Sequence, residues 1–234
     1  MFSPADEPTR YAADVTLLIE AAGDKGIPKR PPLRQKMRIE RSESEAGDRL
    51  TTVDVTPAFS GVPFPVGAED RVIGRLEVNE TTGQVVLLRR SGVPILPRDG
   101  LDLAGLARTG ASFGGWLRNA VITPQQLTIS SRALRASFGG PTRSGQMEVY
   151  RHSDGEHQVE LISSAQTGLL QEEVVRDKGR VALRTTYRYD MVDGLHIRAE
   201  TRIVRQDAEG RSSTYVVSVE NVSVETAVHR EVTP

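Results

Sequence analysis

The sequence predicts a mainly β protein built around a strongly curved antiparallel sheet. Through most of residues 145–224, apolar residues recur at every second position, which is typical of strands buried on one face. Short polar pairs such as Asp154-Gly155 interrupt this alternation, as tight turns between antiparallel strands do. Three expected strands exceed the usual length of about five or six residues: 180–191, 195–206 and 211–224. Long neighbouring strands twist and curl, so we expect the apolar face to be concave.

The N-terminal segments differ in the structure that they predict. Residues 1–10 are polar and contain proline, so we expect a loose terminus. Residues Tyr11–Glu20 fit either a first strand or a short helix. The segment Gly23–Pro32 holds three prolines among basic residues, which indicates a loop.

Two β-hairpins are expected next. The first pairs residues 33–45 with residues 49–55, and the second pairs residues 72–78 with residues 85–89. Between them, residues 56–70 carry three prolines and two phenylalanines. Proline lacks the N–H that a central strand needs, so this segment covers one end of the core or forms a lid.

Residues 97–140 break the alternation and predict a helical insert or lid. The run Thr-Pro-Gln-Gln at residues 123–126 places threonine, proline and glutamine at the N-cap, first and third positions of a helix. We expect that helix to end at Phe138, before two glycines. Residues 101–121 contain four glycines, and each weakens a helix by about 1 kcal/mol, so only short helical turns are expected there.

The C-terminal part predicts a meander of six strands. Their expected ranges are 146–151, 157–164, 169–176, 180–191, 195–206 and 211–224. Strands and helices do not alternate regularly, which disfavours a parallel sheet. We therefore expect a single β domain that spans residues 1–234.

Composition excludes several classes of function. The 30 Lys+Arg residues are balanced by 31 Asp+Glu residues, whereas a dedicated nucleic-acid binder carries a basic excess. The absence of cysteine excludes disulfides, thiolate nucleophiles and zinc–thiolate sites. No stretch approaches the roughly eighteen apolar residues of a membrane-spanning helix. We expect no nucleic-acid partner, no membrane span and no cofactor.

The apolar strand face predicts a binding surface for an apolar ligand. The nominated strand residues are Leu183, Tyr187, Tyr189, Met191, Ile197, Ile203, Val217 and Val219. The nominated lid residues are Phe113, Trp116 and Leu117. The alternative is ordinary core packing, because any sheet that is buried on one side shows the same apolar stripes.

Two short patterns suggest other chemistry. Residues 110–114 match the G-x-S-x-G motif of serine hydrolases, with Ser112 as the nucleophile. That motif needs a strand before the serine and a helix after it, and the flanking glycines and poor strand formers disfavour both. His152 and His157, with Glu156 nearby, flank one turn, and a metal site there is a minor alternative to a solvated turn. We therefore expect neither a catalytic residue nor a metal ligand.

One segment resembles a known family of envelope proteins. The run MEVYRHSDGEHQVELISS, followed by TGLLQEEVVRDKGRVALRTTYRYDMVDGLHIRAETRIV, is similar to the second half of LolA/LolB-like and RseB-like proteins. The resemblance implies an unclosed (half) β-barrel whose helices cover the concave face, and a partner that is a lipid or an acylated protein. The family usually opens with an amphipathic helix, whereas residues 11–20 are short and precede a proline-rich loop.

Three hypotheses of function follow. The first is a non-catalytic binding protein of the bacterial periplasm or envelope that carries or senses a lipid or lipoprotein, from which a signal or anchor has been removed. The second is a structural or interaction module with a filled core, which docks an envelope protein through the loop around Phe59 and Phe64 or through a strand edge. The third is the serine hydrolase at Ser112.

Overall fold

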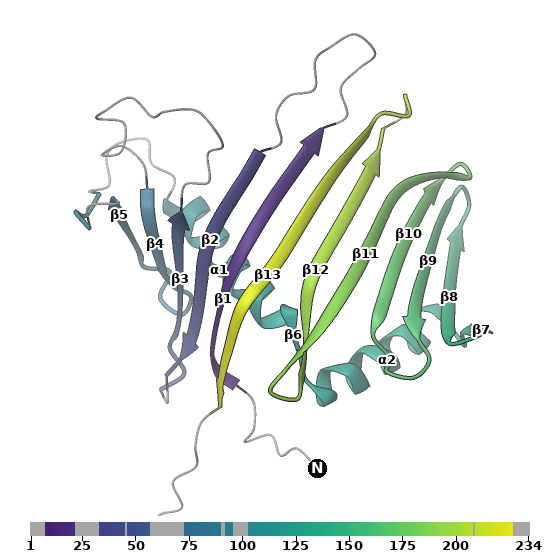
Figure 1. The fold of residues 1–234 in the computed structure, drawn as a ribbon, viewed down its shortest axis with the longest axis horizontal. Coiled ribbons are helices and arrows are strands. Elements are labelled where there is room, and N and C mark those ends of the chain that lie inside the picture. The colour runs from purple at the N-terminus through teal and green to yellow at the C-terminus, as the bar shows by residue number, and fades with distance from the viewer. Residues whose placement is uncertain are drawn as a thin grey trace, which may run out of the picture. The chain divides into compact units, whose positions relative to one another are not determined.

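A computed structural model describes residues 8–21, 33–44, 46–56, 73–89, 92–95, 103–207 and 209–226. Strands dominate these residues, and the mainly β class is confirmed (Figure 1). Several sequence expectations lie outside the described residues: most of the loose terminus, the proline-rich loop at residues 23–32 and the segment around Phe59 and Phe64.

The elements follow one another in long runs of strands around a central helical insert. The first five are β1 (Pro8–Ala21), β2 (Leu33–Glu43), β3 (Arg49–Thr56), β4 (Ile73–Asn79) and β5 (Val85–Arg89). The insert consists of α1 (Leu103–Ala120), β6 (Val121–Ile122) and α2 (Pro124–Phe138). The last seven strands are β7 (Thr142–Ser144), β8 (Met147–Asp154), β9 (His157–Ser164), β10 (Leu170–Asp177), β11 (Arg180–Val192), β12 (Leu195–Gln206) and β13 (Ser212–Thr226).

The strands form one antiparallel sheet that is not closed into a barrel. Its strand order is β5-β4-β3-β2-β1-β13-β12-β11-β10-β9-β8-β7, and β6 pairs with β12 off this path. Residues Tyr11–Glu20 are a strand, the two predicted hairpins are β2–β3 and β4–β5, and all six predicted C-terminal strands are present. The short strands β6 and β7 were not expected, because two or three residues carry no periodic pattern.

The chain divides into two compact units. The first unit comprises Met1–Val15, Gln35–Ala120 and Val219–Pro234, and the second comprises Thr16–Arg34 and Val121–Ser218. Strands β1 and β13 contribute residues to both units.

The sheet of the first unit is apolar on one face and charged on the other. Ile39, Val53, Leu76 and Leu87 are paired directly across β2, β3, β4 and β5, and all four are buried. The next row, one residue along, is charged and contains Arg38, Asp54 and Arg75. Directly paired residues share a face, so this row lies on the opposite side from the buried one.

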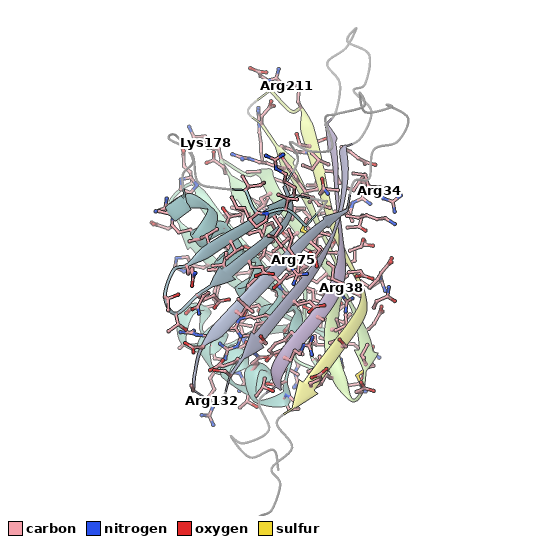
Figure 2. All side chains as sticks on the ribbon, turned by 90° about the vertical axis from the view of Figure 1, so that its left-hand side faces the viewer. Arg34, Arg38, Arg75, Arg132, Lys178 and Arg211 are labelled. Carbon is pink, nitrogen blue, oxygen red and sulfur yellow. The ribbon has the colours of Figure 1, made fainter. Side chains whose placement is uncertain are left out.

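Ion pairs connect the charged face of the first unit. Arg75 lies 3.7 Å from Asp54 and 2.8 Å from Glu77. Arg38 lies 3.0 Å from Asp14, which also accepts a 2.7 Å hydrogen bond from Asn221. Figure 2 labels Arg38 and Arg75 among these side chains. Because the groups are partly exposed, each pair by itself contributes only about 0–1 kcal/mol to the free energy of unfolding.

The stretch that we expected to form short helical turns is a single 18-residue helix, α1. Two of its glycines allow it to lie close against the sheet. A Cβ atom on Gly110 would lie 2.3 Å from Val78 Cγ2, and one on Gly114 would lie 2.1 Å from Thr51 Oγ1. The prediction was wrong because packing against the sheet outweighs the low intrinsic helix propensity of glycine.

A buried ion pair lies beneath α1. Arg41 Nε and Nη2 donate to the two carboxylate oxygens of Glu80 at 3.3 and 3.4 Å, and Thr51 Oγ1 donates to Glu80 at 2.6 Å. The Arg41 and Glu80 side chains are 4% and 11% exposed. Removing one member would leave the other charge buried without a partner. In comparable pairs this lowers the free energy of unfolding by about 3–5 kcal/mol.

In the second unit, α2 begins and ends as its sequence predicts. Thr123 accepts a hydrogen bond from the backbone N–H of Gln126, and the Gln126 side chain accepts one from the Thr123 N–H. Gly139 follows the last turn with φ +77°, in the left-handed region that glycine tolerates. The helix packs on β8, where the rings of Phe138 and His152 meet edge to face at 6.0 Å.

We predict opposite effects of alanine at two glycines of α1. Gly110→Ala drives a methyl group into Val78 and should lower the free energy of unfolding by about 1–3 kcal/mol. A Cβ atom on Gly115 would meet no atom within 4 Å, so Gly115→Ala should raise that free energy by up to about 1 kcal/mol. Urea denaturation of both variants tests this, and equal effects would contradict the close packing of α1.

We also predict a pH dependence from Asp14. The Asn221 hydrogen bond, followed by Arg38, holds the pKa of the Asp14 carboxyl below its ordinary value of 3.8. A lowered pKa adds stability that is present above pH 3.8 and is lost as the pH falls through the folded value. Thermal melts should therefore show a smaller loss between about pH 5 and pH 2.5 for Asp14→Asn than for the wild type. Parallel curves would contradict this assignment.

Candidate functional site

The face of the second unit that bears α2 can be followed from strand to strand. Phe138 of α2 touches His152, which is the first residue of a paired row that continues through Val159, Val175 and Leu183. We call this side the inner face, because directly paired residues share a face. A second row on it contains Tyr150, Leu161, Glu173, Thr185, Ile203 and Tyr215. A third contains Tyr187, Thr201 and Val217.

Burial divides the inner face into two parts. On β8 and β9, Tyr150 and Leu161 are buried, as expected of core beside a helix. On β11, β12 and β13, six apolar side chains of this face are only half-buried: Leu183, Tyr187, Tyr189, Ile203, Tyr215 and Val217. This half-buried part contains five of the residues nominated from the sequence.

A bulge interrupts the pairing of β11 with β12 between Arg188 and Tyr189. Beyond it, Tyr189 pairs with Arg198 and Met191 pairs with His196, while Ile197 pairs with Asp190. The register therefore does not place Ile197 in the same rows as Tyr189 and Met191. Met191 is 63% exposed, whereas Ile197 is 1% exposed and pairs on its other side with Val121 of β6.

The remaining nominated residues belong to the first unit. Phe113, Trp116 and Leu117 lie on α1, with Leu117 fully buried and the two aromatic residues half-buried. Val219 lies on the part of β13 that belongs to the first unit, and it is buried. Their role as a lid or as ligand contacts stays a prediction.

A polar cluster lies within the inner face. The Tyr187 hydroxyl donates to Glu173 at 3.4 Å, and the guanidinium of Arg198 lies 4.8 Å from the centre of the Tyr187 ring. The Tyr189 hydroxyl donates to the Leu170 carbonyl oxygen at 2.7 Å. Burial, followed by the negative charge of Glu173, raises the pKa of Tyr187 to about 12, so its phenol stays protonated at neutral pH.

Arg198 and Glu173 are the site residues that the sequence analysis missed. The Arg198 Nε–H is buried, and no acceptor bonds to it within the described residues. The alternation of β12 alone assigns Arg198 to the side opposite Ile203, and only the bulge brings it to Tyr187. The Tyr-x-Tyr pattern at residues 187–189 was the one visible signal, because buried phenols require polar partners.

The structure contradicts the local context that a Ser112 nucleophile requires. Ser112 lies in the middle of α1, and its hydroxyl donates to the Arg108 carbonyl oxygen at 2.7 Å. Ser112 therefore does not occupy the turn between a strand and a helix that the motif requires. Its flanking residues in the sequence already disfavoured such a turn.

The two turn histidines have separate partners. His157 Nδ1 lies 3.4 Å from Asp177, and His152 packs against Phe138. Within the described ranges, no three histidine or carboxylate side chains are grouped so that they could hold a metal ion. Neither helix of the described chain is long and apolar enough to cross a membrane.

Comparison with known proteins gives distant structural similarities. No protein-family model matches the chain, and no curated protein does. A domain of Vibrio parahaemolyticus described as a putative outer membrane lipoprotein-sorting protein is 10% identical, covers 97% of this chain and 90% of its own, and has a TM-score of 0.44. A LolA superfamily protein from Nitrosomonas europaea is 13% identical over 96% of this chain and 89% of its own, with a TM-score of 0.43.

A third solved structure, a DUF1329 family protein from Desulfovibrio piger, is 11% identical over 96% of this chain and 88% of its own, with a TM-score of 0.43. The LolA superfamily is one of the families represented among these similar structures. Identities this low leave the function of the chain to be inferred from its own residues.

We predict that Glu173 raises the pKa of Tyr187 and that the adjacent Glu172 does not. Glu173→Gln removes the negative charge beside the phenol and should lower its pKa from about 12, while desolvation should keep it above 10.0. Glu172 pairs with Thr186 and bonds Arg184 at 3.0 Å on the outer face, so Glu172→Gln should leave that pKa unchanged. Absorbance titration of each variant against its Tyr187→Phe counterpart gives the two values, and equal shifts would contradict the prediction.

Proposed function

We propose that this chain is a non-catalytic binding protein of the bacterial cell envelope, located in the periplasm. It holds an acyl chain or lipid, free or attached to a lipoprotein, on the inner face of β11, β12 and β13, and acts as a carrier or sensor. The sequence resemblance of residues 147–204 to LolA/LolB-like proteins is consistent with this proposal.

The observation that carries the proposal is the half-buried apolar part of the inner face. Leu183, Ile203 and Val217 lie on three adjacent strands, and their side chains are neither enclosed as core nor fully solvated. An apolar ligand that covers them would remove this surface from water. Each buried methylene contributes about 0.8 kcal/mol, so an acyl chain can repay the entropy lost on association.

The chemistry of the inner face suits a ligand with a polar end. The apolar side chains of Leu183 and Ile203 lie on the same side of the sheet as the phenols and the guanidinium of the Tyr187–Arg198 cluster. Binding sites for small amphiphiles combine a mostly apolar lining with a few oriented polar groups. Nothing in this arrangement requires a nucleophile or a metal ion, so we assign a binding role.

Adjacent residues of β12 provide a matched test. Ile203 pairs with Thr185 and Tyr215 on the inner face, whereas Val204 pairs with Arg184 and Thr214 on the outer face, and both are half-buried. Ile203→Asn should weaken binding of the uncharged fluorescent probe N-phenylnaphthylamine by about tenfold, because a bound amide loses water without gaining a partner. Val204→Asn should leave the affinity unchanged.

Fluorescence titration and displacement of the probe by phospholipid measure these affinities, with thermal melts as a check that both variants fold. Equal loss in both variants, or a wild-type protein that binds neither probe nor lipid, would contradict the proposal. The second result would favour the interaction module with a filled core.

A further inference from the structure

We propose that Arg198, together with the Tyr187 hydroxyl, recognises the anionic oxygen atoms of a ligand's head group, carboxylate or phosphate, so that the preferred ligand is an anionic amphiphile. This inference rests on the proposed function, because it assigns the polar end of the same site.

Arg198 is held by stacking, and its donors are not all used. Its guanidinium carbon lies 4.8 Å from the centre of the Tyr187 ring, a cation–π distance. A guanidinium carries five N–H donors in one plane, and stacking on a ring occupies its face and leaves that edge available. The Nε–H is buried and bonds to no acceptor in the described part of the chain. An unpaired buried donor is costly, and an anionic ligand toward which the half-buried Arg198 side chain turned would remove that cost.

The charge of Arg198 also lacks the partner that neighbouring arginines have. On the outer face, Arg184 lies 3.0 Å from Glu172, and Arg188 lies 2.7 Å from Asp190. No ion pair of the described residues includes Arg198, and the nearby Glu173 bonds the Tyr187 hydroxyl instead. A half-buried guanidinium without a carboxylate binds a carboxylate or phosphate through strong, charge-assisted hydrogen bonds.

Tyr187 supplies a second donor at the same place. Its phenol is kept protonated by burial and by Glu173, since its pKa lies near 12. Its present hydrogen bond to Glu173 is long, at 3.4 Å, so a ligand oxygen can compete for the proton. The site would then present a cation and a neutral donor to the head group, beside the apolar side chains of Leu183, Ile203 and Val217 that contact the acyl chain.

The test compares amphiphiles that share a dodecyl chain and differ in head group. Isothermal titration calorimetry would measure binding of dodecanoate, dodecyl phosphate and uncharged dodecyl maltoside. We expect the wild type to prefer the anions by about tenfold or more, the range of a charge-assisted hydrogen bond. Comparison of the first two ligands distinguishes a fatty-acid carboxylate from a phospholipid phosphate as the preferred head group.

Arg198→Gln should abolish the preference for anions and leave the affinity for the maltoside unchanged. The matched control is Arg202→Gln on the same strand, which removes the same charge at an exposed position paired with Thr186 on the outer face. It should retain the preference. If Arg198→Gln does not fold, Glu173→Gln decides, because loss of the competing carboxylate should strengthen the preference severalfold.

A wild type that binds all three amphiphiles equally would overturn the head-group assignment and leave the proposed function intact. Retention of the preference in Arg198→Gln, or no change in Glu173→Gln, would also overturn it. If none of the amphiphiles binds, both the inference and the proposed function fail.

Discussion

The structure depends on one geometric constraint: each strand must place its apolar side chains on a single face in a register that its neighbours share. In the first unit, Ile39, Val53, Leu76 and Leu87 form one buried row across four strands. A slip of one residue would exchange that row for the one that contains Arg38, Asp54 and Arg75. The burial of one face thus fixes the register, and the register fixes which side chains are available to a ligand.

The two helices meet the sheet by different means. Helix α1 carries four glycines, and two of them let its backbone approach Val78 and Thr51 over the buried Arg41–Glu80 pair. Helix α2 is capped by its own sequence and packs through Phe138. Helix α1 depends on tertiary packing, whereas helix α2 is specified by its local sequence. Substitutions at the glycines of α1 therefore test how closely that helix packs on the sheet.

Much of the fold, but less of the site, can be predicted from the sequence. The alternation of apolar and polar residues predicts the strands, and the Asp-Gly and Lys-Gly pairs predict the turns between them. Asp193 and Lys178 adopt positive φ values at these turns, each beside a glycine. The capping box gives the start of α2. The length of α1 could not be predicted, since its stability comes from contacts with residues far away in sequence. The polar cluster was missed for a similar reason: the bulge after Arg188 depends on how two strands pair, and neither strand shows it alone.

An amphiphile bound on the inner face of β11, β12 and β13 can be detected by native mass spectrometry of the chain purified from a bacterial envelope, followed by organic extraction. We expect a stoichiometric adduct that dissociates on extraction as an anionic lipid or a fatty acid. A protein that carries no adduct, and whose mass stays unchanged after incubation with anionic lipid, would contradict it.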